Sequence, residues 1–237
     1  MFLRAARLHT PRTELPSWLA DLPVVRSLER QPLEFDTPVT ILTGENGTGK
    51  STLVEALAVG LRLNPEGGSR HATVSTVADS VSPLHEHLLL TRPRNPRDAW
   101  FLRGESHLNV AAYYESLGPS PIDDLLHMSH GESLMALVER RFHHEGIFLL
   151  DEPEAGLSHL RQLELLGRLW HLADAGAQFI MATHSPILLA VPGARILELD
   201  ESGLQKRTLE ETECHRAAVE FMSDPHGTAA FLTGEEP

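Results

Sequence analysis

The chain of 237 residues contains 41% hydrophobic and 22% charged residues, and its 33 acidic and 20 basic residues give a formal net charge of −13. This length allows one large α/β domain or two small ones, and the acidic balance disfavours nucleic acid as a direct ligand. A single cysteine, Cys214, excludes an intrachain disulfide and fits a reducing cytoplasm. No apolar run reaches the roughly 20 residues of a membrane span, so we expect a cytoplasmic protein without direct membrane insertion.

The first third of the chain contains several short strand-like runs and one helix. Prolines indicate a loop after the first strand, within which residues 24–28 are expected to be extended. A helix that includes residues 52–58 is expected to end near Pro65, because proline cannot continue it. Residues 66–69 are expected to form a loop. The predicted strands are residues 2–8, 33–35 and 39–42, and the loop prolines are Pro11, Pro16 and Pro23.

The rest of the chain alternates apolar strands with helices. Residues 147–150 and 179–183 are almost entirely apolar, which is typical of strands buried on both faces. The alternation predicts an α/β fold, a mainly parallel sheet flanked by helices. The basic, proline-rich turn at residues 92–98 favours a solvated hairpin tip over a partner site. Further strands are predicted at 88–91, 100–103 and 195–199, helices at 107–116, 133–142, 160–173 and 212–222, a helix break at 118–121, a helix end at Gly146 and a helical tail after Pro225.

Residues 44–51 follow the strand 39–42 and precede the first long helix. In this context the pattern G-x-x-x-x-G-K-[ST] is typical of a phosphate-binding loop. Its glycines let backbone N–H groups surround an anion, and the helix N-terminus adds partial positive charge. Lys50 is expected to reach the β- and γ-phosphates and Ser51 to hold Mg²⁺; the alternative is a chance glycine turn. The candidate loop residues are Gly44, Glu45, Asn46, Gly47, Thr48, Gly49, Lys50, Ser51 and Thr52.

Asp151 and Glu152 directly follow the buried strand 147–150. This is the end of a strand at which α/β sheets place their ligands. Asp151 is expected to bind Mg²⁺, directly or through water, and Glu152 to polarise the attacking water. The alternative is a helix N-cap with an acid that complements the helix dipole. The phosphate-binding loop upstream favours the metal-and-base interpretation.

Two further segments carry candidate phosphate contacts. His184 follows the strand 179–183 in the corresponding place, where an imidazole can hydrogen-bond a γ-phosphate oxygen. Ser129 and Gly131 open the helix 133–142 and could form a second anion-binding end. A plain capping box, with Ser129 as N-cap and Glu132 at the third helical position, explains this segment equally well.

The order of these motifs resembles the ABC-type ATPase domain. The resembling parts are a Walker A loop at 44–51, a signature motif at 129–133, a Walker B strand with a catalytic glutamate at 148–152, a D-loop at 154–158 and a switch histidine, His184. The amino-acid sequence resembles, over nearly its whole length, a group of small bacterial stand-alone ATPases often labelled AAA family. The resemblance implies a P-loop NTPase of ABC type with an antiparallel β part, in a single domain 1–237 whose helical signature subdomain covers roughly 104–145. It also implies a head-to-tail homodimer, closed by ATP binding and reopened by hydrolysis, in which Ser129, Gly131 and Glu132 of one copy cover the nucleotide of the other.

The sequence departs from transporter members of this family. Met128 to Glu132 read Met-Ser-His-Gly-Glu, where transporters usually have Leu-Ser-Gly-Gly-Gln. The usual Q-loop glutamine is absent, and Glu105 is the candidate stand-in, with an oxygen that reaches Mg²⁺ or the lytic water. A helix N-terminal acid is an equally good explanation of Glu105. Trp18 lies in a plausible upstream region for an adenine-stacking aromatic, without a defined register.

The leading hypothesis is therefore an Mg²⁺-dependent ATPase that works as an ATP-gated dimer and drives or switches an unknown protein partner. One alternative is the ATP-binding subunit of an ABC membrane transporter, which the altered signature disfavours. Another is a nucleotide-switched module in DNA maintenance or phage defence, for which salt-sensitive binding through Arg92, Arg94 and Arg97 would be the marker.

Overall fold

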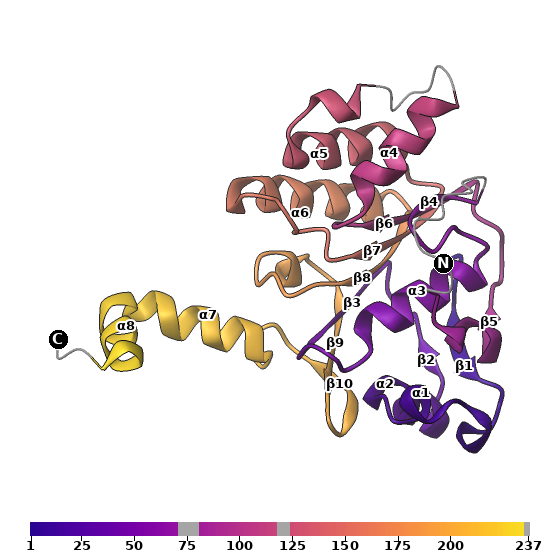
Figure 1. Cartoon of the computed structure of the whole chain (residues 1–237), viewed down its shortest axis with the longest axis horizontal. Helices are drawn as coiled ribbons and strands as arrows, with labels where there is room; N and C mark the ends of the chain where they lie inside the picture. Colours follow the sequence, from indigo (N-terminus) through magenta and orange to yellow (C-terminus); the bar gives the residue numbers. More distant parts are fainter. Residues whose placement is uncertain (71–80, 118–123, 235–237) are drawn as a thin grey trace.

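The computed structural model, which describes residues 1–70, 81–117 and 124–234, is built around a seven-stranded sheet (Figure 1). Its strand order is β10-β9-β3-β8-β7-β6-β4. The five inner strands are parallel, and an antiparallel strand pairs with each outer one of them. The strands are β3 (Val39–Gly44), β4 (Gly68–Ser69), β6 (Asp98–Arg103), β7 (Gly146–Asp151), β8 (Gln178–Ala182), β9 (Arg195–Asp200) and β10 (Gly203–Arg207). The order of the inner strands brings the ends of β3, β7 and β8 to one edge.

A smaller antiparallel sheet covers one side of the central sheet. Its strand order is β2-β1-β5, with β1 (Ala5–Leu8) in the middle, β2 (Leu33–Glu34) on one side and β5 (Leu88–Thr91) on the other. Helix α3 (Lys50–Gly60) lies between the two sheets, and its Leu53, Val54 and Leu57 are fully buried in the core that both sheets share. This packing anchors the helix that follows the candidate phosphate-binding loop.

Three helices cover the other face of the central sheet. They form a second core with residues of β6, β7 and β8, and they gather at the top of Figure 1. They are α4 (His107–Ser116), α5 (His130–Arg141) and α6 (His159–Asp174). The remaining helices are α1 (Ser17–Ala20), α2 (Pro23–Arg30), α7 (Glu213–Ser223), α8 (Pro225–Thr233) and the short 3₁₀ helices η1 (Arg12–Glu14), η2 (Pro83–His87), η3 (Leu125–His127) and η4 (Leu188–Ala190). Helices α7 and α8 project from the body in Figure 1.

The architecture confirms the predicted α/β class, with its mainly parallel sheet, antiparallel β part and helical layer. The strand and helix predictions are confirmed in most places, with boundaries displaced by a few residues. The predicted helix break at 118–121 lies outside the described residues. In the part of the chain that the structure describes, no helix is long and apolar enough to cross a bilayer.

Residues 24–28, expected to be extended, are helical, and this prediction was wrong. Helix α2 begins at Pro23, whose fixed φ suits the first helical position. Val24, Val25 and Leu28 then form a buried stripe at helical spacing. The β-branched valines suggested an extended segment, but tertiary burial of this stripe overrides their local preference.

Helix α3 ends at Gly60 rather than near Pro65, so that boundary was also misplaced. Arg62 has a φ of 66°, in the left-handed region. Its N–H donates to the Val59 carbonyl at 2.8 Å, and the Leu63 N–H donates to the Ala58 carbonyl at 2.9 Å. These two hydrogen bonds form a Schellman motif, which ends the helix several residues before Pro65.

Three smaller expectations were wrong, and one strand was missed. The expected loop 66–69 includes β4, which pairs with β6. Gly146 does not end α5, which stops at Arg141, but begins β7. The turn 92–97 is a crossover between the two sheets rather than a hairpin tip, because β5 pairs with β1 and β6 pairs with β7. Strand β10, which the sequence did not indicate, pairs antiparallel with β9.

Candidate nucleotide-binding site

The candidate phosphate-binding loop connects β3 to α3. Gly49 caps the helix with a φ of 99°, a left-handed conformation that favours glycine. A Cβ on Gly49 would lie 2.6 Å from the Val24 Cγ1 atom on α2. Helix α2 therefore packs directly against the loop, and a side chain larger than hydrogen at position 49 would force the two apart.

Lys50 is folded back over this loop. Its side chain is only 5% exposed, and its Nζ donates hydrogen bonds of 2.8 Å to the carbonyl oxygens of Gly44 and Glu45. Burial lowers the pKa of the ammonium, while the carboxylates of Glu152 and Asp151 act in the opposite direction. The lysine is thus a desolvated cation beside acidic groups, held where the loop turns.

Asp151 ends β7 beside Ser51. Burial raises the pKa of Asp151 to about 6, and a hydrogen bond from Ser51 and the charge of Arg103 oppose this effect. Its Oδ1 atom is buried and has no partner among the described residues. A cavity of about 220 Å³ is lined by Ser51, Arg103, Gly104, Glu105, Asp151 and Glu152. Hydroxyl and carboxylate oxygens, the atoms that a hard divalent cation prefers, thus line this cavity together with the Arg103 guanidinium. The described residues contain no cluster of three or more His, Cys, Asp or Glu side chains placed to hold a metal by themselves.

Glu152 has an unusual backbone. Its φ is 47°, in the left-handed region that side chains rarely adopt. Its N–H donates to the Ala182 carbonyl at 2.9 Å, which ties it to the end of β8. Such a conformation costs roughly 1–3 kcal/mol and persists where the surroundings impose it, commonly at functional sites.

His184 follows the end of β8, near the loop. It lines a second cavity, of about 160 Å³, with Gly44, Glu45 and residues of α7. Its backbone N–H donates to Glu154 Oε1 at 2.7 Å, whereas its ring Nε2 is buried with no partner in the described chain. Burial, and then the charge of Lys50, lower the pKa of the ring. The histidine is therefore predominantly neutral near neutral pH, with its free ring nitrogen available to a ligand.

Trp18 lies beside the loop, on α1. It lines a cavity of about 220 Å³ that also touches Asn46, Gly47, Lys50 and Glu152. The indole is 56% exposed, which is unusual for so large an apolar group. The structure thereby gives Trp18 the position that the sequence left undefined.

The signature-like segment forms the capping box that was one of the two interpretations. The Glu132 N–H donates to Ser129 Oγ, and the Ser129 N–H donates to Glu132 Oε2 at 3.0 Å. Ser129, Gly131 and Glu132 line none of the three cavities around the loop. Within one copy the structure therefore does not bring this segment to the candidate nucleotide site.

Sequence reasoning missed two residues at this edge. Arg103 lies opposite Asp151 in the register of β6 and β7, with its Nε 3.7 Å from Asp151 Oδ2 and its Nη1 3.0 Å from Glu55 Oε2. Glu154 holds the backbone of His184, as described above. The position of Arg103 at the end of a predicted strand indicated that it could lie at this edge. Its contact with Asp151 could not be predicted, because it depends on the order of the strands in the sheet.

A parallel sheet in which a strand runs through a glycine loop with Lys-Ser into a helix defines a P-loop nucleotide-binding protein. Comparison with known families refines this class. Residues 24–86 match an AAA domain family, and residues 110–190 match one described as "AAA domain, putative AbiEii toxin, Type IV TA system".

Two of the relatives are named as ATP-binding proteins of export or transport systems. The chain is 29% identical over 180 residues to the cytochrome c biogenesis ATP-binding export protein CcmA of Rhizobium meliloti, which covers 67% of this chain and 83% of that protein. It is 28% identical to the zinc transport system ATP-binding protein AdcC of Streptococcus pneumoniae, over 61% of this chain and 70% of that protein. These matches and the motif order identify an ABC-type ATPase domain, a class that binds and hydrolyses ATP.

Solved structures with similar chains include a putative metal-chelate type ABC transporter in an inward-facing conformation, with a TM-score of 0.48, 18% identity and coverage of 80% of both chains. Another is the SMC head domain from Thermotoga maritima, with a TM-score of 0.44, 12% identity and coverage of 88% of this chain and 99% of that one.

Proposed function

We propose that this ABC-type ATPase domain binds Mg²⁺-ATP at the carboxyl edge of its central sheet and hydrolyses it within a head-to-tail pair of copies. The observation that carries the proposal is the convergence of Ser51, Asp151 and Glu152 on one cavity at the end of β7. In this proposal the nucleotide state of the pair switches a protein partner in the cytoplasm, and each copy is a single domain with a helical part at roughly 104–145.

The loop residues 44–52 would bind the phosphates. Backbone N–H groups of the loop and of the first turn of α3 would donate to phosphate oxygens, and Lys50 would exchange its carbonyl partners for them. Ser51 and Asp151 fit a magnesium ion, because both offer oxygen and Asp151 Oδ1 is buried without a partner. When bound, the ion supplies positive charge that offsets the charge of the phosphates. Glu105 lines the same cavity and would be a further oxygen ligand.

Three further residues at this edge would contact the attacking water, the γ-phosphate and the adenine ring of ATP. Glu152, fixed by its left-handed backbone, would accept a proton from the attacking water. The free Nε2 of His184 would hydrogen-bond the γ-phosphate. Trp18 would stack on the adenine, which would cover the exposed face of the indole.

The second copy would complete the site. Ser129, Gly131 and Glu132 lie away from the cavities of their own copy, and the partly open end of α5 offers backbone N–H groups for an anion. A γ-phosphate that bridges two copies makes contacts in the closed pair only, so ATP would favour closure and its hydrolysis would favour opening.

The substitution Glu152→Gln tests this proposal. It keeps the size of the side chain but removes the proton acceptor, so the variant is expected to bind ATP and accumulate as a dimer. Size-exclusion chromatography with light scattering, under saturating Mg²⁺-ATP, measures the mass. Glu145→Gln is the matched control, because Glu145 is an exposed acid at the opposite edge of the sheet. A Glu152→Gln protein that binds ATP but stays monomeric contradicts the paired site.

A second candidate function is the ATP-binding subunit of an ABC transporter. The similarity to CcmA and AdcC, both named as ATP-binding proteins of export or transport systems, favours it. This function requires a membrane-spanning partner. Affinity purification of the Glu152→Gln variant with Mg²⁺-ATP from solubilised membranes is expected to retain a multi-span protein on this alternative, and no such protein on the leading proposal.

A further inference from the structure

Two histidines pack together outside the roles assigned above. His107 begins α4, and His130 begins α5 between Ser129 and Gly131. Their rings meet edge to face, with centroids 4.2 Å apart and ring planes at 89°. The Nε2 atoms of both rings are buried and have no hydrogen-bond partner among the described residues. Buried polar atoms without partners are rare and costly, so this pair needs an explanation.

His107 is fixed to the loop beside the candidate site. Its Nδ1 lies 3.0 Å from the Gly104 carbonyl oxygen, which can only accept, so Nδ1 carries the hydrogen of the neutral ring. Burial lowers the pKa of His107, which agrees with a neutral ring. The Gly104 N–H in turn donates to the Asp151 carbonyl at 2.9 Å. A Cβ on Gly104 would overlap the Glu152 carbonyl, so this loop packs directly on the Asp151–Glu152 turn.

His130 is seated on the loop that follows the same turn. Gly156 has a φ of 75°, and a Cβ there would lie 2.9 Å from His130 Nε2 and 3.0 Å from Cγ. The ring therefore lies on bare backbone, which only glycine at position 156 allows. This loop also carries Glu154, whose carboxylate accepts the His184 N–H. His107 is thus bonded to Gly104, which lines the cavity at Asp151, and His130 lies on a loop two residues beyond Glu154.

Local helix chemistry does not require a histidine at position 130. The capping box of α5 is made by Ser129 and Glu132, so the residue between them needs only to be compatible with the first helical turn. What His130 adds is a contact between three segments that lie apart in the chain: the loop at Gly104, the start of α5 and the loop at Gly156.

We propose that the His107–His130 contact, seated on Gly156, is a positioning device that fixes Ser129 and Gly131 relative to Asp151 and Glu152 of the same copy. In a head-to-tail pair, one copy must present Ser129 and Gly131 to its partner's nucleotide while it holds its own nucleotide at Asp151 and Glu152. The histidine pair fixes the position of Ser129 and Gly131 relative to Asp151 and Glu152. This inference rests on the proposed function, since the orientation of Ser129 matters only if two copies meet.

The test compares His107→Ala, His130→Ala and the double variant. Binding of a fluorescent ATP analogue to the isolated copy is expected to stay within about twofold, because the loop 44–52 is untouched. In the Glu152→Gln background, the protein concentration needed for ATP-dependent dimerisation is expected to rise about tenfold, and in the wild-type background kcat is expected to fall about tenfold with little change in KM. The double variant is expected to match either single variant, because all three break the same contact.

Two further variants separate positioning from simple destabilisation. His130→Phe keeps an aromatic edge or face for His107 and is expected to restore dimerisation to within about threefold of the Glu152→Gln parent. His127→Ala, at an exposed histidine three residues earlier, is expected to change nothing. Thermal unfolding confirms that each variant is folded at the assay temperature.

The outcomes distinguish the two proposals. A Glu152→Gln protein that never dimerises removes the proposed paired site. A Glu152→Gln protein that dimerises, and does so at the same concentration with His130→Ala, overturns the positioning role alone. Effects of His107→Ala and His130→Ala that add in full, or a His130→Phe variant as impaired as His130→Ala, also overturn it.

Discussion

At the amino edge of the central sheet, the side-chain amide of Gln178 accepts hydrogen bonds from the N–H groups of Phe2 and Leu3 at 2.7 and 2.9 Å and donates one to the Leu3 carbonyl at 2.7 Å. At the carboxyl edge of the same strands, Asp151 Oδ1 and His184 Nε2 are buried without partners in the described chain. The polar atoms of Gln178 are satisfied within the fold, while Asp151 Oδ1 and His184 Nε2 are left for a ligand. Gln178 thus contributes to folding stability at one end of the strands, while Asp151 and His184 at the other end are available for ligand binding.

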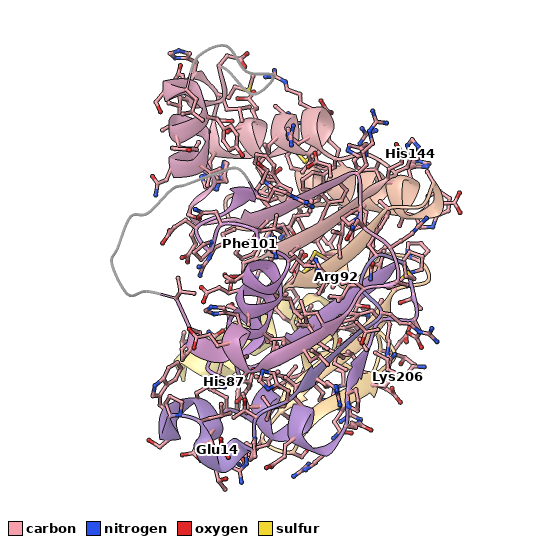
Figure 2. All side chains as sticks on the ribbon, turned by 90° about the vertical axis from the view of Figure 1, so that its right-hand side faces the viewer. Glu14, His87, Arg92, Phe101, His144 and Lys206 are labelled. Carbon is pink, nitrogen blue, oxygen red and sulfur yellow. The ribbon has the colours of Figure 1, made fainter. Side chains whose placement is uncertain are left out.

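The charged side chains at the two edges also differ. At the amino edge, a cavity of about 500 Å³ is lined by Arg94, Arg97, His144 and Glu145, and Figure 2 shows His144 and Arg92 on this side of the molecule. Arg97 pairs with Glu145 at 2.8 Å, and the Arg94 guanidinium lies 4.3 Å from the centre of the Phe2 ring. At the carboxyl edge, Lys50 is buried and donates to the carbonyl oxygens of Gly44 and Glu45. Changes at the two edges should therefore separate function from stability.

The largest effect is expected for Lys50→Ala, at the carboxyl edge. Loss of charge-assisted bonds to phosphate should weaken ATP binding by about 3 kcal/mol, or about 100-fold. Burial of the ammonium costs free energy in the free protein and opposes the two hydrogen bonds that it donates, so its removal should change the unfolding temperature little. Isothermal titration with Mg²⁺-ATP and thermal unfolding measure the two quantities. Lys206→Ala, at an exposed lysine of β10 labelled in Figure 2, is the control for charge. An unchanged ATP affinity in Lys50→Ala would contradict the proposal that this loop binds the phosphates.

A stability effect without a functional one is expected for Gln178→Leu, at the amino edge. The change leaves backbone groups of Phe2 and Leu3 buried and unpaired, which should cost about 3 kcal/mol of unfolding free energy. ATP affinity of the folded protein should stay unchanged. Urea denaturation and ATP titration check this, with Gln31→Leu at an exposed position as control. A Gln178→Leu protein as stable as the parent would contradict the account of this edge.

The substitution Asp151→Asn is expected to increase the free energy of unfolding, in protein free of divalent cations. A carboxyl with a raised pKa destabilises the folded state only while it is ionised, so its cost is absent below its ordinary pKa of 3.8, grows up to about 6 and is constant above that. Asp151→Asn should therefore be more stable than the parent by about 1–3 kcal/mol at neutral pH and equally stable near pH 3.8.

Chemical denaturation across this pH range, with a chelator present, measures the difference. With excess Mg²⁺-ATP the order should reverse, because the parent carboxylate then gains a ligand that the amide binds poorly. An Asp151→Asn variant that is less stable than the parent at every pH would show that Arg103, rather than a cation, balances this carboxylate.

The smallest effect is expected for Arg97→Ala. Its ion pair with Glu145 is exposed, so solvent screens it and the unfolding midpoint should not change measurably. ATPase activity should also be unchanged. Binding of a short DNA duplex, measured by fluorescence anisotropy at low and physiological salt, tests the alternative of a nucleic-acid site in this turn. Salt-sensitive binding that is lost in Arg97→Ala would assign this edge a function of its own.

Motifs whose residues are adjacent in the chain could be predicted from the sequence. The candidate phosphate-binding loop 44–51 consists of consecutive residues between a strand and a helix, and strand, loop and helix were all placed correctly. The capping box of Ser129 and Glu132 spans one helical turn and was recognised as one of two interpretations. The fully apolar run 147–150 identified a strand buried on both faces, because apolar side chains on both faces require cover on both sides.

Contacts between distant segments could not be predicted, because they depend on strand order. Helix α2 is stabilised by burial of Val24 and Val25, and Val24 lies against Gly49 at the phosphate-binding loop, which no local pattern indicates. Arg103 meets Asp151 only because β6 pairs with β7 in a particular register. Gln178 fixes Phe2 across a separation of 176 residues.

The sequence by itself thus determined the nucleotide chemistry of this protein, since that chemistry resides in short segments with their own local geometry. The tertiary structure decided which buried groups are satisfied and which are left free. Whether Asp151, His107 or Gln178 has a partner depends on the packing of elements far apart in the chain, and local periodicity does not encode that packing.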